Sequence, residues 1–258
     1  YTAEIDEIAL AAPYYLIVKS AGNDRGDGNG EPDHPQDGGA EGYDCIGYKG
    51  NAKNILTVGA VQDVSGGYSG NPGDVVMTSF SSWGPTDDGR IKPDICGNGY
   101  GVYSSDDTGN AGYRSLNGTS MSSPNVTGSL LLIQEHYEEN FGSYLKAATL
   151  KALAIHTADE CGPDDGPDYM FGWGLMNTQS AAEVISNKDI STFIKEESIS
   201  NGSTYTLEVS ATGTEPLVAT IVWADPAGTP VANQLDPTDV MLVNDLDMNI
   251  TDGSTTYY

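Results

Sequence analysis

The chain has 258 residues, of which 38% are hydrophobic, and this is enough for one large domain or for roughly one and a half ordinary ones. Its 11 basic and 37 acidic side chains give a formal net charge of −26 at pH 7. A charge of this sign repels phosphate backbones and anionic lipid, so the composition argues against nucleic acid and membrane surfaces as partners.

The first elements predicted along the chain are a helix over residues 2–12 and a short buried strand at 16–18. Ile5 and Ile8 lie at helical spacing, and Pro13 ends the helix. A helix that leads into a buried strand is typical of the middle of an α/β unit.

An acidic loop over residues 24–33 follows this strand. It alternates carboxylates and amides with glycines, as loops that bind hard cations do. It departs from the EF-hand template because Pro32 stands where glycine is required, so a structural calcium ion and a solvated acidic loop both stay open. The candidate ligands in this loop are Asp24, Asp27 and Asn29.

The middle of the chain alternates strands with helices. Further strands are predicted at 54–61 and 74–80, and helices are predicted after Ser120, over 143–157 and over 180–186. This alternation predicts an α/β fold.

From about Lys188 onward the pattern changes to short strands. They are predicted at 204–209, 217–223, 241–243 and 246–250. We therefore expect a second, all-β part of the chain. A second set of candidate calcium ligands lies there: Asp225, Asp245 and Asp247.

The most informative stretch is GTSMSSP at 118–124, which places Ser120 at a glycine-introduced turn that runs into an apolar helix. At a helix start a serine hydroxyl can be exposed, held rigidly and surrounded by backbone N–H groups that favour negative charge. The alternative for a serine-rich turn before a helix is an ordinary N-cap.

Four segments, in order along the chain, resemble motifs of the subtilisin-like serine proteases (subtilases). They are SAGN at 20–23, IKPDI at 91–95, GTSMSSP at 118–124 and YMFGWGLMN at 169–177. They resemble the family's oxyanion-hole segment, the strand before the nucleophile loop, the nucleophile signature and the closing segment. The resemblance implies an α/β domain over residues 1–188, with a mostly parallel sheet flanked by helices. A partial, jelly-roll-like β-sandwich is implied over 189–258.

The resemblance also implies a function, that of a serine endopeptidase. Ser120 would be the nucleophile, and Asn23 would donate a side-chain N–H to the oxyanion beside the backbone N–H of Ser120. No cofactor is expected for this chemistry, and the substrate would be a protein or peptide. The resemblance and the acidic composition imply an extracellular, secreted protein. The residues expected to border the substrate are Ser20, Ala21, Gly22, Gly47, Gly118 and Thr119.

The histidines do not complete a triad. In subtilases the catalytic residues follow the chain order Asp, His, Ser, and by resemblance Tyr1 falls after the first two. We therefore expect a C-terminal portion of a longer polypeptide, whose N-terminal part supplies the Asp and His. None of His34, His136 and His156 is assigned as the general base.

Two other functions stay open as alternatives. One is a catalytically inactive subtilase-like scaffold with a binding β-sandwich, which the presence of both Ser120 and Asn23 argues against. The other is an esterase or lipase, whose nucleophile elbow requires glycine where this chain has Ser122.

Three cysteines allow at most one internal disulfide and leave at least one thiol. They are Cys45, Cys96 and Cys161.

Overall fold

The computed structural model describes residues 1–26, 42–211, 213–214, 216–232, 234 and 237–257. At its centre lies a three-stranded parallel sheet in the order β1-β2-β3. The strands are β1 (Val18–Ser20), β2 (Leu56–Val61) and β3 (Ile95–Asn98). Every residue of β2 is buried, which explains why this strand reads as a continuous apolar run rather than an alternating one.

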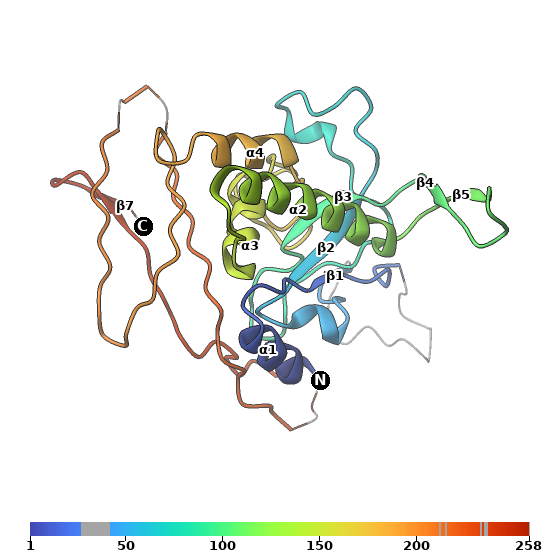
Figure 1. The fold of residues 1–258 in the computed structure, drawn as a ribbon. Helices are drawn as coiled ribbons and strands as arrows, with labels where there is room; N and C mark the ends of the chain where they lie inside the picture. Colours follow the sequence, from blue (N-terminus) through green and yellow to red (C-terminus); the bar gives the residue numbers. More distant parts are fainter. Residues whose placement is uncertain (27–41, 212, 215, 233, 235–236, 258) are drawn as a thin grey trace.

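Four α-helices accompany this sheet: α1 (Thr2–Ala11), α2 (Thr119–Phe141), α3 (Ala147–His156) and α4 (Thr178–Ser186). Figure 1 shows α2, α3 and α4 gathered on one side of the sheet, whereas α1 lies apart from them. The predicted α/β architecture, with a parallel sheet flanked by helices, is confirmed. Helix and sheet side chains share one core, which includes Leu56, Val58, Ile95, Val126, Leu130, Ile133, Leu153 and Ile185.

A β-hairpin between the sheet and α2 was not expected from the sequence. Strands β4 (Val102–Ser105) and β5 (Tyr113–Leu116) pair antiparallel, and Figure 1 shows them projecting away from the sheet. The stretch predicted as a strand at 74–80 holds instead the 3₁₀ turn η3 (Pro72–Asp74) and a single bridge from Met77 to Val61. A second 3₁₀ turn, η2 (Tyr48–Asn51), precedes β2.

The C-terminal part has less regular structure than its sequence pattern predicts. The strands in the described part of 189–257 are β6 (Ile250–Thr251) and β7 (Thr256–Tyr257), which pair antiparallel. The runs at 204–209, 217–223 and 241–243 lack strand pairing, although Figure 1 shows this part as long extended stretches. An extended run becomes a strand only when a neighbour takes its backbone hydrogen bonds. The β-sandwich stays a prediction. None of the helices in the described ranges is long and apolar enough to cross a membrane.

The buried carboxylate of Asp94 links two lysine side chains to the backbone of the sheet. Asp94 accepts hydrogen bonds from the ammonium groups of Lys92 (2.5 Å) and Lys151 (2.8 Å) and from the backbone N–H of Thr57 (2.6 Å). Burial by itself would raise the pKa of Asp94, but Lys151 and Lys92 outweigh it and hold this pKa below its usual range. Burial lowers the pKa of Lys92 to about 7. The motif IKPDI therefore contributes charged side chains that link β2 to the segment before β3.

Ser122 fixes α2 to the backbone of the sheet. Its buried hydroxyl lies 2.6 Å from the carbonyl oxygen of Gly59 in β2 and 2.9 Å from that of Gly97 in β3. The helix that carries Ser120 is thus hydrogen-bonded to two strands within its second turn.

We expect Ser122→Ala to lower the free energy of unfolding by about 1–3 kcal/mol, because it removes a buried hydroxyl that donates to the backbone of the sheet. Denaturation in urea measures the change. Ser129→Ala is the matched control: Ser129 is half-buried on the same helix, and its loss should change stability by less than about 0.5 kcal/mol. Equal effects of the two substitutions would contradict this account of Ser122.

Candidate active site

Ser120 is exposed and is the second residue of α2. Gly118 caps the helix with φ 150°, in the region that favours glycine over other residues. Among the described residues, the backbone N–H of Ser120 has no acceptor, as expected in the first turn of a helix. Ser120 therefore combines an exposed residue surface with a backbone N–H that has no acceptor among the described residues.

The turn before Ser120 lies close to the backbone of Gly99. The Gly118 N–H donates to the Gly99 carbonyl (2.8 Å). A Cβ on Gly99 would lie 2.6 Å from the Cβ of Ala60 and 2.8 Å from the Gly118 carbonyl oxygen, so only glycine fits there. The sequence CGNG at 96–99 supplies this close approach.

Asn23 lies beside the start of α2. Its side-chain oxygen accepts hydrogen bonds from the N–H (2.9 Å) and the hydroxyl (3.0 Å) of Thr119. These bonds orient the amide so that its NH₂ group stays available. A Cβ placed on Gly118 would lie 3.6 Å from the Ser120 nitrogen and 3.7 Å from the Asn23 Nδ2, so both donors border the same glycine. The structure thus brings together the two residues predicted from SAGN and GTSMSSP.

The segment before Asn23 continues the edge of β1. Ala21 is buried, and its N–H donates to the Val58 carbonyl (2.9 Å), while its own carbonyl accepts from the Gly47 N–H (3.2 Å). The Gly22 N–H donates to the Thr119 hydroxyl (3.3 Å). These contacts bring together four of the predicted substrate-bordering residues, namely Ala21, Gly22, Gly47 and Thr119.

Gly22 and Ser20 complete this edge. Gly22 has φ 126°, and a Cβ there would lie 2.6 Å from both the Ser82 hydroxyl and the Asp24 carboxylate. Ser20 has a different environment: the Lys19 ammonium lies 2.8 Å from its hydroxyl and 2.9 Å from its carbonyl. Ser82 also contacts this edge: its hydroxyl accepts from the Asp24 N–H (3.1 Å), and its N–H donates to the Gly22 carbonyl (3.0 Å).

The two described histidines lie away from Ser120. His136 is sixteen residues further along α2, which at 1.5 Å per residue is about 24 Å, and its ring lies 2.9 Å from the Ser186 hydroxyl. The ring of His156 lies 2.9 Å from the Thr220 hydroxyl, and burial lowers its pKa. His34 falls outside the described residues.

The calcium sites stay predictions. Asp27 and Asn29 fall outside the described residues, while Asp24 is engaged with Ser82. The Asp225 carboxylate is occupied by nitrogen donors, including the Lys53 ammonium, and this leaves little for a cation. The described part of the chain contains no cluster of three or more His, Cys, Asp or Glu residues suited to a metal. The remaining candidates, Asp245 and Asp247, are exposed.

With this geometry in place, the sequence was compared with known proteins. The profile of the subtilase family matches residues 1–174. The chain belongs to the subtilase family. The match covers the sheet, the Asn23 loop and helix α2, all of which the sequence motifs had indicated.

Curated relatives of this subtilase are much longer. A C5a peptidase of Streptococcus pyogenes serotype M18 is 42% identical over 121 residues, which cover 43% of this chain and 10% of that protein. The serine protease/ABC transporter B family protein tagA of Dictyostelium discoideum is 26% identical over 218 residues, covering 71% and 12%. The chain thus spans about a tenth of these relatives.

Among solved structures, the self-cleaved protease domain of PatA matches with a TM-score of 0.52 and 20% identity. The match covers 73% of this chain and 56% of that one. At this identity the match supports the subtilisin-like fold alone.

The cysteines of this subtilase are free thiols rather than a disulfide pair. Cys96 and Cys161 are buried, and Cys45 is half-buried. Burial raises the pKa of Cys96 well above its usual value and that of Cys161 to about 12. Although Cys96 neighbours the turn that leads to Ser120, its sulfur faces the core and lies 3.5 Å from the Phe171 carbonyl oxygen.

We expect Ellman's reagent at pH 8 to react slowly with the folded protein, and at Cys45 before the other two, because thiolate is the reactive form and burial disfavours it. In urea all three thiols should titrate, which is the internal control. Rapid labelling of Cys96 in the folded protein, or fewer than three thiols in urea, would contradict the structure.

Proposed function

We propose that this chain is the C-terminal part of a serine endopeptidase domain that hydrolyses peptide bonds through an acyl-enzyme on Ser120. The observation that carries the proposal is the position of the exposed Ser120 at the start of α2, with its free N–H and the oriented Asn23 amide bordering the same glycine. Membership of the subtilase family and relatives named as peptidases support it.

In the proposed mechanism the Ser120 hydroxyl attacks the scissile carbonyl carbon while a histidine removes its proton. The carbonyl oxygen becomes an oxyanion, which accepts hydrogen bonds from the Ser120 N–H and the Asn23 side chain. The histidine then gives the proton to the departing amine, and water hydrolyses the acyl-enzyme by the same steps. We propose that this histidine and its aspartate partner come from sequence upstream of Tyr1.

The substrate is proposed to be a protein or peptide in extended form. The edge formed by Ser20, Ala21 and Gly22 carries only small side chains, which lets a substrate backbone approach closely. Ala21 and Gly22 are themselves fixed by hydrogen bonds to β2 and to Thr119. The acidic composition and the family support an extracellular location as part of the same proposal.

We expect Ser120→Ala in the full-length protein to abolish peptide hydrolysis, because it removes the nucleophile. A fluorophosphonate should label the unaltered protein at Ser120, as located by peptide mass spectrometry, and should not label the variant. Ser123→Ala, on the same helix, is the matched control and should retain labelling. Absence of labelling in a folded, full-length protein would refute the proposal and favour the inactive scaffold.

We expect Asn23→Ala to lower kcat about 10²–10³-fold with little change in KM, because Asn23 acts on the oxyanion and not on the ground state. This range is the known loss for the corresponding asparagine of subtilisin. Steady-state kinetics on a peptide substrate measures it. Asn140→Ala, an exposed position near the far end of α2, should leave both constants unchanged. A loss confined to KM would contradict the oxyanion role.

A further inference from the structure

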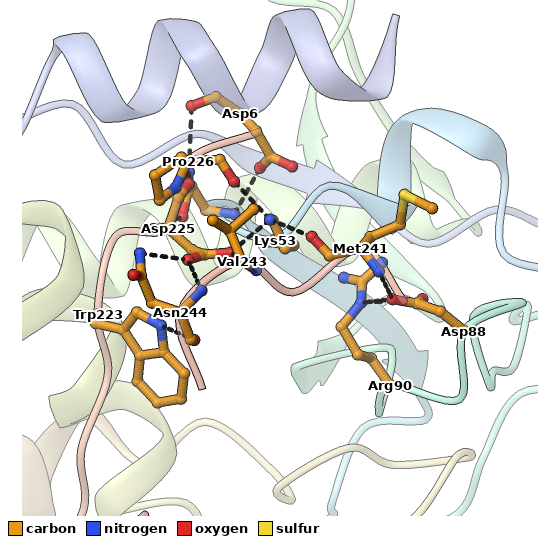
Figure 2. Close-up of polar contacts among 11 residues, drawn as sticks. Asp6, Lys53, Asp88, Arg90, Trp223, Asp225, Pro226, Met241, Val243 and Asn244 are labelled. Atoms are coloured by element: carbon orange, nitrogen blue, oxygen red, sulfur yellow. Dashed lines mark hydrogen bonds and ion pairs between the residues drawn. The ribbon is translucent and has the colours of Figure 1, made fainter. Parts of the chain in front are cut away.

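Lys53 is a buried lysine of the sheet-containing part of the chain. Its ammonium group donates its hydrogen bonds to the C-terminal part. Its side chain is only 6% exposed. The ammonium donates to the Asp225 carboxylate (2.5 Å), the Pro226 carbonyl (2.6 Å) and the Met241 carbonyl (2.5 Å). An ammonium has three donors, so all of them are satisfied by residues more than 170 positions away. Figure 2 shows the three acceptors converging on it.

Asn54 also contacts the C-terminal part. Its side chain pairs with the backbone of Asp225 in the way that a neighbouring strand would. Its side-chain amide donates to the Asp225 carbonyl (2.7 Å) and accepts from the Asp225 N–H (2.8 Å). The Asn54 backbone N–H in turn donates to the buried carboxylate of Asp6 in α1 (2.9 Å). The backbone of Asp225 is therefore held by the body of the protein as firmly as its side chain.

Asp225 also organises the C-terminal part itself. Its two carboxylate oxygens accept from the backbone N–H groups of Val243 (2.9 Å) and Asn244 (2.8 Å) and from the Asn244 side chain (2.9 Å). The indole N–H of Trp223 donates to the Asn244 carbonyl (3.1 Å). Residues 222–228 and 241–244, called here the docking segment, are thus tied to each other by the same carboxylate that meets Lys53 (Figure 2).

We propose that the docking segment is a preorganised ligand for the surface around Lys53 and Asn54, and that it keeps the C-terminal part bound to residues 1–188 when the chain between them is cut. The ordering entropy of binding falls when a ligand is already fixed in its bound form, and the contacts within the segment do this. The surface around Lys53 and Asn54 therefore binds a segment of the same chain, and the Asp225 carboxylate lies at the centre of that segment.

The position of the ion pair makes the association resistant to salt. Asp225 is 2% exposed, and a buried pair is screened much less than one in solvent. A further contact joins the Met241 N–H to the Asp88 carboxylate (3.1 Å), which Arg90 holds in place (2.8 Å). Removing one partner of a buried pair leaves the other charge desolvated and unpaired, which is strongly unfavourable.

The experiment cuts the chain in the exposed turn between Ser200 and Ser203, where the Ser203 N–H donates to the Ser200 carbonyl (2.9 Å). A recognition sequence for a site-specific protease, followed by an affinity tag, is inserted between Asn201 and Gly202 in the full-length protein. The protein also carries Ser120→Ala, so that the result does not depend on the proposed peptidase activity. After cleavage the tagged C-terminal fragment is captured, and the N-terminal fragment bound to it is quantified.

We expect the two fragments to be captured together, with about the same yield of N-terminal fragment in 0.1 M and in 1 M NaCl. Lys53→Met and Asp225→Asn should each weaken the association by about 100-fold or more. Asp247→Asn is the matched control, since it removes one negative charge from an exposed position of the same fragment and should leave the association unchanged.

Separation of the unsubstituted fragments, with the N-terminal fragment still folded by circular dichroism, would overturn the proposal. So would full retention in both Lys53→Met and Asp225→Asn. Each substitution removes one partner of the ion pair, and the two partners lie on different fragments. If one variant fails to fold, the other still tests the proposal. The cut, unsubstituted protein tests the association without either.

Discussion

The closeness of α2 to the backbone of the sheet is the constraint on which the rest of the site depends. The Ser122 hydroxyl reaches carbonyl groups of both β2 and β3, and it can do so only because glycines face it. A Cβ on Gly97 would lie 2.8 Å from Val126 and 3.1 Å from the Ser122 hydroxyl. A Cβ on Gly99 would lie 3.2 Å from the Cβ of Ser122. Any larger residue would lift the start of the helix, and Ser120 with it.

The strands beneath this helix are held by charge as well as by apolar packing. Asp94 joins Lys92, Lys151 and the backbone of Thr57, whose register partner in β1 is Lys19. Burying ions is unfavourable unless they are paired and hydrogen-bonded, so such a cluster specifies one arrangement of its strands more than it adds stability. The site edge at Ala21 and the helix start at Ser120 therefore rest on strands whose relative register has few alternatives.

The sequence predicted the residues of the site because their roles demand particular residue types close together in the chain. Ser120 follows a cap that favours glycine, and Asn23 follows a half-buried strand, so short motifs were sufficient. Helix spacing likewise predicted α1 and α3 to within a few residues. Periodicity failed for the hairpin of β4 and β5, because its residues are mostly exposed and no buried face imposes alternation.

Contacts between distant residues could not be predicted in the same way. A lysine such as Lys53 is typical of a solvated surface, and nothing beside it in the sequence indicates an acceptor 172 positions away. Asp225 was one of three candidate calcium ligands in the C-terminal part, because a carboxylate can bind a metal ion as well as an ammonium group. Which positive group it meets is decided by the fold, and here the Lys53 ammonium contacts it.

The docking segment contacts the chain just before β2, whereas the site contacts the middle of that strand. Lys53 and Asn54 lie just before β2, whereas Val58 and Gly59, further along it, contact the Asn23 loop and α2. From Asn54 to Gly59 an extended chain spans about 17 Å. Between these positions β2 is paired on both sides and hydrogen-bonded to Asp94. The docking contacts thus hold the C-terminal part in place, while the geometry around Ser120 is set by the sheet itself.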